Sequence, residues 1–338
     1  MKIVITGSAG FIGFHLALRL LREGHEVLGF DALTDYYDVR LKRARHAVLG
    51  EFRAFRAVAG HLENADLVQA TIAAAKPEIV VHLAAQAGVR YSLEHPETYV
   101  ASNSVGTFNL LEALRRTPVR HAILASTSSV YGGTPNQVFV ETDRTDFPLS
   151  IYAATKRGTE AMAHSYAHLF AIPVTMARFF TVYGPWGRPD MALFRFAGAI
   201  EAGTPIEVYG EGRQSRDFTY IDDVVEAVVR LLDTPPVAGQ SVAATDPVSP
   251  VAPWRAVNVA GGRPVELMAF IAALEHAMGK EAVKRLVPMQ AGDMSNTRAD
   301  TTLLRALTGF VPSVGIDEGT RAFVDWFRTD WARLRAQT

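Results

Sequence analysis

Residues Thr6–Gly13 read TGSAGFIG and lie between a short apolar run, Lys2–Thr6, and a helical pattern, Phe11–Arg22. Three glycines at this spacing suit a tight turn after a strand, the close approach of a pyrophosphate to the backbone, and close packing of helix on strand. A diphosphate at this point meets the free N–H groups and the positive end of the helix dipole. Taken alone, the glycines are also compatible with an ordinary strand-to-helix turn.

An acidic residue strengthens the nucleotide interpretation. Asp31 ends the second apolar run, Glu26–Asp31, about 20 residues after the glycine loop. A carboxylate there can accept a hydrogen bond from a ribose 2′-hydroxyl and disfavours a 2′-phosphate. The sequence therefore predicts a dinucleotide site for NAD rather than NADP.

Short apolar runs alternate with helical patterns over the first 180 residues. The expected strands are Lys2–Thr6, Glu26–Asp31, Phe52–Ala57, Ile79–Leu83, His121–Ser126 and Val174–Phe180. The expected helices are Phe11–Arg22, Asn64–Ala75, Pro96–Arg115 and Ile151–Phe170. Strands that are apolar on both faces belong to a parallel sheet covered by helices on both sides. We predict an α/β fold, a Rossmann-type doubly wound parallel sheet with a smaller, mostly helical C-terminal substrate domain.

The pattern changes after Phe180. Helical patterns at Pro189–Gly203 and Asp222–Leu232 precede a loop rich in Pro, Ser and Ala, and one more strand is expected at Arg255–Val259. We predict that residues 1–180 form the NAD-binding domain and that 218–260 return to it. Residues 181–217 and 261–338 are then the substrate-binding domain.

Composition excludes several classes of protein. The 338 residues carry 34 Lys and Arg against 35 Asp and Glu, a balance that argues against a nucleic-acid or polybasic membrane partner. The absence of cysteine excludes disulfides, thiolate metal sites and cysteine nucleophiles, and the histidines do not follow metal-ligand spacing. The N-terminus lacks a signal-peptide pattern and no apolar run reaches membrane-spanning length. We expect a cytoplasmic protein without a metal site.

Two short patterns carry the chemistry. Tyr152 and Lys156 are four residues apart and share one face of a predicted helix. A tyrosine titrates near 10, and a nearby ammonium favours its phenolate, so this pair suits a catalytic base. The hydroxyl run Ser126–Ser129 follows a predicted strand, at the sheet edge where ligands bind. A surface i,i+4 pair and helix-capping hydroxyls are the alternative interpretations.

The sequence resembles the extended short-chain dehydrogenase/reductase superfamily, in its NAD-dependent nucleotide-sugar epimerase/dehydratase branch. It is most similar there to UDP-glucuronate 4-epimerases. The resemblance rests on the glycine loop, His82–Ala85, Asn103, Thr127–Gly132, Tyr152 with Lys156, Gln86–Arg90, Arg178–Ala192, Arg216–Asp223 and Pro288–Asp293.

The resemblance implies a catalytic set of Tyr152, Lys156, Thr127, Ser128 and Ser129. Tyr152 takes the proton of the C4 hydroxyl, and Lys156 holds the nicotinamide ribose and lowers the tyrosine pKa. Thr127 hydrogen-bonds the C4 oxygen. Hydride leaves C4 for a tightly bound NAD and returns to the other face of a 4-keto sugar, which converts UDP-glucuronate reversibly into UDP-galacturonate.

The resemblance also implies two binding sets. The cofactor set is Gly7, Gly10, Phe11, Ile12, Gly13, Asp31, Leu62, Leu83, Ala84, Ala85, Gln86, Asn103, Ser126, Tyr152, Lys156 and Phe179. The set for the UDP-sugar substrate is Arg90, Thr127, Ser128, Thr181, Arg188, Val208, Arg213, Arg216, Asp293 and Arg298.

Two features separate the sister reactions. Ser128 and Ser129 stand where dehydratases and decarboxylases of this branch place an acid, which favours simple epimerisation. Thr181 and Arg188 can bind a C6 carboxylate, although Arg188 can instead be a loop arginine paired with Asp190. The alternatives are an epimerase for neutral UDP-hexoses or N-acetylhexosamines, a UDP-glucuronate decarboxylase, and a non-catalytic NAD sensor.

Two positions depart from the pattern. His61 follows Gly60 where relatives place an acid near the adenine, and Arg298 stands where an aromatic residue is usual. The resemblance further implies a homodimer formed through the helix that bears Tyr152 and the helix before it. Met162, Tyr166 and Leu169 are candidates for that face, and core packing explains them equally well.

Overall fold

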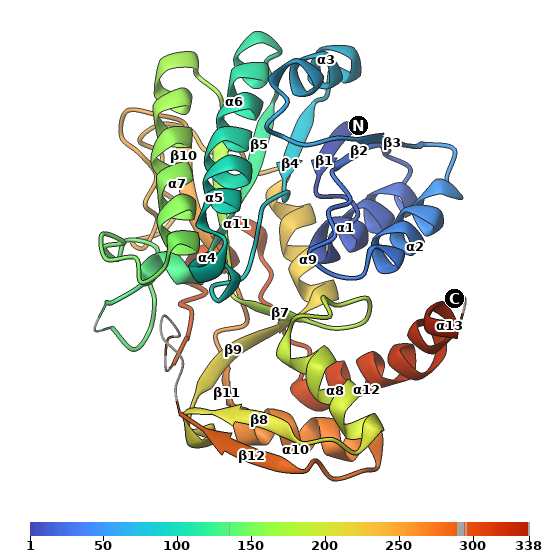
Figure 1. Ribbon diagram of the computed structural model, residues 1–338. Coiled ribbons are helices and arrows are strands. Elements are labelled where there is room, and N and C mark those ends of the chain that lie inside the picture. Colours follow the sequence, from blue (N-terminus) through green and yellow to red (C-terminus); the bar gives the residue numbers. More distant parts are fainter. Residues whose placement is uncertain (135, 289–293, 295, 337–338) are drawn as a thin grey trace.

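A computed structural model describes residues 1–134, 136–288, 294 and 296–336 (Figure 1). A seven-stranded parallel sheet fills its larger part, in the order β10-β6-β5-β4-β1-β2-β3. The strands are β1 Lys2–Thr6, β2 Glu26–Asp31, β3 Phe55–Ala59, β4 Ile79–His82, β5 His121–Thr127, β6 Val174–Phe179 and β10 Trp254–Val259. Because β1 pairs with both β2 and β4, the chain order reverses beside β1, where doubly wound sheets bind ligands. The predicted fold class is confirmed.

Helices cover both faces of this sheet (Figure 1). On one face α1 (Phe11–Arg22), α9 (Ile221–Leu231) and α11 (Thr302–Thr308) pack on the strands with Leu49 of α2 (Val39–Gly50). On the other face lie α3 (Ala65–Ala75), α6 (Gly106–Arg116) and α7 (Ile151–Phe170). The six strands other than β3 are therefore largely buried on both sides, as their apolar sequences require. The edge strand β3 departs from this expectation, because Arg56, Ala57 and Ala59 are exposed.

Three elements of this part differ from the prediction. Helix α2 was not expected, because it buries Lys42 and Arg45 and its sequence lacks a clear apolar stripe. Strand β3 begins at Phe55 instead of Phe52, since a turn closes between the Phe52 carbonyl and the Phe55 N–H. The expected helix Pro96–Arg115 is three pieces: α5 (Pro96–Tyr99), a π-helix η1 (Val100–Val105) and α6.

The smaller part lies below the large sheet in Figure 1 and is built around aromatic side chains. Its helices are α8 (Ala192–Ala202), α10 (Leu267–Met278) and α12 (Ile316–Trp326). At the chain end α12 continues into η4 (Phe327–Trp331) and α13 (Ala332–Ala336). Phe194 lies edge-to-face with Phe323 and Phe327, which buries one apolar face of α12 and η4.

Two small sheets accompany these helices and were not predicted. Strands β7 (Thr181–Tyr183), β9 (Ser215–Tyr220) and β11 (Pro264–Glu266) form one sheet, and β8 (Ile206–Tyr209) pairs with β12 (Lys284–Val287) in the other. Strands of three to six residues with few apolar positions leave only a weak signal in the sequence. The remaining short elements are α4 (Tyr91–Glu94), η2 (Ser128–Tyr131) and η3 (Gly210–Gly212).

The chain crosses between the two parts more than once. After β9 it returns through α9 and β10 to the large sheet, where β10 pairs in parallel with β6. It then leaves through β11 and comes back once more as α11, which packs on β10. Within the described residues, no helix is both long and apolar enough to cross a lipid bilayer.

Candidate active site

The glycine loop fits tightly at the switch point of the sheet. Gly7 has a φ of +76°, and a Cβ on it would lie 2.7 Å from the Ala84 backbone nitrogen. A Cβ on Gly13 would collide with the Gly7 carbonyl. Gly10, at the start of α1, offers no side-chain cap to the helix N–H groups. The loop thus presents uncapped backbone donors to a ligand, an arrangement that fits a dinucleotide diphosphate.

Asp31 joins this loop to the end of β2. Its Oδ2 accepts a hydrogen bond from the Ala9 N–H at 2.9 Å, and its Oδ1 accepts one from the Leu33 N–H at 2.8 Å. Each carboxylate oxygen keeps a second lone pair for a further donor. The carboxylate is thereby fixed beside the cavity, where a ribose hydroxyl can reach it.

A cavity of about 290 Å³ runs from the glycine loop to Tyr152 and Lys156. Every predicted cofactor residue except Asn103 lines it. Asn103 lies behind the lining, where its Oδ1 accepts from the Gln86 N–H at 2.8 Å and its Nδ2 donates to the Gln86 carbonyl at 3.1 Å. Asn103 belongs to the π-helix η1, and such turns are frequent at functional sites.

Sequence reasoning missed several residues of the lining, among them Tyr36, Tyr37 and Lys42 in the segment after β2. The Lys42 Nζ donates to the Thr34 carbonyl at 2.6 Å and to the Thr34 hydroxyl at 2.9 Å, which closes this segment over Asp31. The only sequence feature that could have indicated these residues is their position shortly after Asp31, at the end of β2. His61, the departure noted in the sequence, also lines the cavity next to Leu62.

Tyr152 and Lys156 lie on the first turns of α7, which Ser150 caps by accepting the Ala153 N–H. Thr127, at the end of β5, lines the same cavity. Burial raises the pKa of Tyr152, while a hydrogen bond with Thr127 and the charge of Arg188 act to lower it. The Lys156 Nζ donates to the Ala125 carbonyl at 3.0 Å. That Lys156 lowers the pKa of Tyr152 stays a prediction.

Lys156 is buried and has a charged neighbour one helical turn on. Burial lowers the pKa of Lys156 to about 8, against the opposing charge of Glu160. Glu160 forms a fully buried ion pair with Arg178 at 2.8 Å and accepts the Ser126 hydroxyl at 2.6 Å. The hydroxyl run is thus anchored to the same helix that carries the tyrosine and the lysine.

Arg188 reaches the same cavity from the loop that follows β7. Its Nε and Nη2 bind Asp190 at 3.0 and 2.5 Å, so the pairing considered from the sequence is present. The pair uses two of the three guanidinium nitrogens. It does not remove Arg188 from the site, because the arginine still lines the cavity and its charge is felt by Tyr152.

A second cavity of about 120 Å³ collects further predicted residues, namely Ser128, Ser129, Thr181 and Arg216. The Thr127 side chain accepts the Ser129 N–H at 3.2 Å, which orders this end of β5. Here Arg216 lies beside two serine hydroxyls, so donors for phosphate or sugar oxygens are concentrated in one place.

Of the other predicted substrate residues, the four that the structure describes line neither cavity. Arg90 lies 4.4 Å above the ring of Tyr209, and Val208 is fully buried in β8. Arg213 is exposed and paired with Glu211 at 2.7 Å, while Arg298 accepts the Phe139 N–H through its carbonyl. Asp293 lies outside the described residues.

A glycine cradle at the switch point, with a tyrosine, a lysine and hydroxyls at the carboxyl edge of the sheet, defines a dinucleotide-dependent enzyme of the short-chain dehydrogenase/reductase type. The chain belongs to the NAD dependent epimerase/dehydratase family, whose model matches residues 3–242. The resemblance inferred from the sequence is confirmed.

Individual relatives are similar along almost the whole chain. A probable UDP-glucuronate 4-epimerase of Rhizobium meliloti is 54% identical over 336 residues, 98% of each chain. Protein CapI of Staphylococcus aureus is 49% identical and covers 97% of this chain and 98% of its own. The crystal structure of the UDP-glucuronic acid 4-epimerase of Bacillus cereus, with UDP-glucuronic acid and NAD, superimposes with a TM-score of 0.87 at 33% identity, covering 97% of this chain and 99% of that one.

Proposed function

We propose that this protein is a UDP-glucuronate 4-epimerase, which interconverts UDP-glucuronate and UDP-galacturonate. One observation carries the proposal: Arg188 lines the same cavity as Tyr152, Lys156 and Thr127, and its charge reaches the tyrosine. An acidic sugar therefore finds a cation beside the reacting centre. The names of the relatives at 54% and 33% identity support the same substrate.

The residues of the cavity fit NAD through the glycine cradle, the uncapped start of α1 and Asp31. When bound, NAD supplies the acceptor and donor of the hydride at C4. Tyr152 takes and returns the proton of the C4 hydroxyl, and Thr127 holds that oxygen. The two pKa influences on Tyr152 that favour the phenolate come from Thr127 and from Arg188, so both also assist the base.

The carboxylate is the part of the substrate that needs protection. A 4-keto uronate is a β-keto acid, which loses carbon dioxide when the C5–carboxylate bond stands perpendicular to the carbonyl plane. Arg188 and Thr181 hold the carboxylate away from that geometry through charge-assisted hydrogen bonds. Ser128 and Ser129 place hydroxyls, rather than an acid, after Thr127, so elimination and decarboxylation lack a partner carboxyl there.

Incubation of the purified protein with UDP-glucuronate, without added cofactor, tests the proposal. We expect the anomeric proton signals of UDP-galacturonate to appear in the NMR spectrum and to reach a stable ratio. Rescue only after addition of NAD would indicate weak adenine binding at His61. If UDP-glucuronate is not converted even with added NAD, but UDP-glucose is, the substrate is a neutral UDP-hexose. This second candidate is favoured by the Arg188–Asp190 ion pair, which partly neutralises the arginine.

The division into two parts follows the same logic. Residues 1–180 and 218–260 bind NAD, and residues 181–217 and 261–338 bind the UDP-sugar, except that α11 packs on the large sheet. Support comes from the cofactor residues of the glycine loop and β4, and from Thr181, which faces the second cavity. The protein acts in the cytoplasm, where cells hold NAD and nucleotide sugars.

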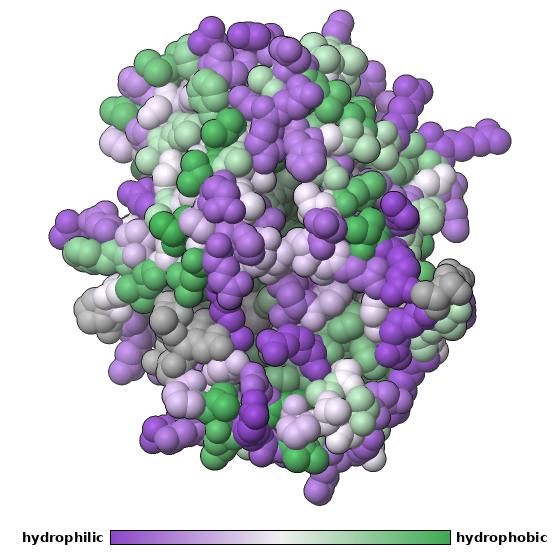
Figure 2. Space-filling view, viewed as in Figure 1, coloured by the Kyte–Doolittle hydropathy of each residue, from purple (hydrophilic) through white to green (hydrophobic). Residues whose placement is uncertain are grey.

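The protein forms a homodimer through α6 and α7. Apolar side chains are exposed on these two helices and on η1, among them Val100, Val105 and Phe108. Figure 2 shows hydrophobic surface along this side of the molecule amid largely hydrophilic side chains. In the middle of α7 the exposed residues are small, including Ala154 and Gly158, which lets a second pair of helices approach closely. Met162 and Tyr166 instead pack on the core, whereas Leu169 is exposed.

A further inference from the structure

Arg45 is a buried cation for which the catalytic scheme has no use. It lies on α2, is 0% exposed, and among the described residues no carboxylate lies within ion-pair distance of it. An unpaired buried charge is costly, so its hydrogen-bond partners indicate what it does. All of its bonds connect segments that line the site.

The guanidinium bridges the two loops of the site. Its Nη1 donates to the Ala9 carbonyl in the glycine loop at 2.7 Å and to the Tyr37 hydroxyl at 2.8 Å. Its Nη2 donates to the Trp186 carbonyl at 2.5 Å and to the Gly187 carbonyl at 3.2 Å. The residue that follows these two carbonyls is Arg188.

The backbone held in this way is strained. Trp186 has a φ of +57°, a left-handed conformation that a bulky side chain rarely adopts. Its ring packs against Phe14 of α1 and Trp326 of α12, and the preceding Pro185 carbonyl is bonded to His15. Such a conformation persists only where the surroundings fix it, and Arg45 binds the two carbonyls that directly precede Arg188.

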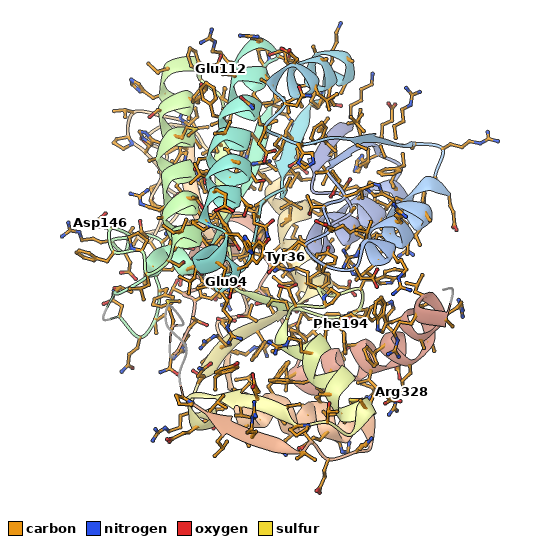
Figure 3. All side chains as sticks on the ribbon, in the orientation of Figure 1. Tyr36, Glu94, Glu112, Asp146, Phe194 and Arg328 are labelled. Carbon is orange, nitrogen blue, oxygen red and sulfur yellow. The ribbon has the colours of Figure 1, made fainter. Side chains whose placement is uncertain are left out.

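The turn that precedes α2 also reaches the partner of Arg188. Tyr36 donates to the Asp190 carboxylate at 3.2 Å, and the Arg188 guanidinium lies 5.9 Å from the Tyr36 ring centre. Figure 3 shows Tyr36 in the middle of the molecule, where its two parts meet. Residues 36–45 thus contact the Arg188 loop at its backbone and at its counter-ion.

We propose that Arg45 is a positioning residue for uronate recognition: it locks the Trp186–Gly187 backbone onto the glycine loop and so sets where Arg188 meets the substrate carboxylate. The planar fork is required, because a lysine ammonium cannot bridge carbonyls on two separate loops in a fixed plane. This inference rests on the proposed function, since it assigns Arg45 to the recognition of the acidic sugar.

A double-mutant cycle of Arg45→Lys and Arg188→Met tests it, with the dissociation constants of UDP-glucuronate and of UDP measured by calorimetry. Arg45→Lys alone is expected to weaken UDP-glucuronate about tenfold and to leave UDP, which has no carboxylate, within about twofold. In the Arg188→Met background, Arg45→Lys is expected to have no further effect on UDP-glucuronate. Arg255→Lys, at a buried arginine paired with Asp246 outside the site, is the matched control and is expected to change neither constant.

Equal weakening in both backgrounds, or equal loss of UDP and UDP-glucuronate binding, would overturn the inference. Failure of Arg45→Lys to fold while Arg255→Lys folds would do the same, because the role would then be structural. The wild-type protein separates the two claims. If it binds and epimerises UDP-glucuronate but the cycle is additive, only the role of Arg45 fails; if it does neither, the proposed function fails and the inference with it.

Discussion

At the scale of single residues, the site balances burial against charge at Tyr152. Burial favours the neutral phenol, and the Thr127 hydroxyl and the Arg188 charge favour the phenolate. Because the base must lose its proton, catalysis by this tyrosine rises with pH. Burial also lowers the pKa of Lys156 to about 8, so the charge of Lys156 is lost above that pH.

Thr127→Val removes one of the groups that favour the phenolate. We predict that the alkaline-going rise of kcat/KM with pH moves to higher pH in this variant, in addition to a lower maximum. Rate profiles from about pH 6 to about pH 9 check this. A profile that falls in height without moving would mean that Thr127 does not act on the Tyr152 pKa.

Arg188→Met removes the cation while keeping a side chain of similar length. We predict that the KM for UDP-glucuronate rises about tenfold or more, since a charge-assisted hydrogen bond contributes ~1.5–3 kcal/mol. We also predict a decarboxylated UDP-pentose among the products, visible by mass spectrometry. Arg144→Met, at an exposed arginine paired with Asp146, is the control. An unchanged KM with epimer alone would refute the carboxylate clamp.

At the scale of elements, the glycine loop was predictable and the segment after β2 was not. The glycine spacing alone predicted the loop, and the structure shows that a Cβ at each of the three glycines would clash with the backbone. Helix α2 was not predicted because its buried face includes Lys42 and Arg45. These charged residues interrupt the apolar periodicity by which a packed helix is recognised in a sequence. Likewise, the family resemblance predicted Asn103 as a cofactor residue, but the π-helix η1 that holds it has no recognisable sequence pattern.

The tightness of the loop gives a prediction for Gly13→Ala. The added methyl group collides with the Gly7 carbonyl, so the loop must shift away from the strand. We predict that the purified variant retains far less NAD, measured by absorbance after acid release, and is only partly rescued by added NAD. Gly50→Ala is the control, because nothing lies within 4 Å of a Cβ at that position of α2. Equal NAD content in the two variants would contradict the cradle.

At the scale of the whole molecule, the reaction depends on residues from both the larger and the smaller part. The chain passes between these two parts more than once. Arg188 and Thr181 come from the start of the second part, whereas Tyr152 belongs to the first. The parallel sheet and its helices followed from apolar runs in the sequence. The two small sheets did not, because their short strands meet partners distant in sequence, such as β8 with β12.

The proposed dimer is testable at Gly158, which is exposed on α7 and has open space around a Cβ. Gly158→Arg is tolerated by the isolated fold but places a charge in the helix–helix contact. We predict a monomer by sedimentation velocity where the wild type is a dimer. Gly198→Arg, on α8 with equally open surroundings, is expected to leave the assembly unchanged. A Gly158→Arg dimer would place the interface elsewhere.

The central claim is that the C4 centre is inverted by removing and returning its own hydride. UDP-glucuronate with deuterium at C4, incubated with the enzyme in ordinary water, tests this directly by NMR and mass spectrometry. We predict UDP-galacturonate that keeps the deuterium at C4, with no pentose product. Loss of the deuterium to water, or recovery of unchanged substrate in the presence of NAD, would contradict the account.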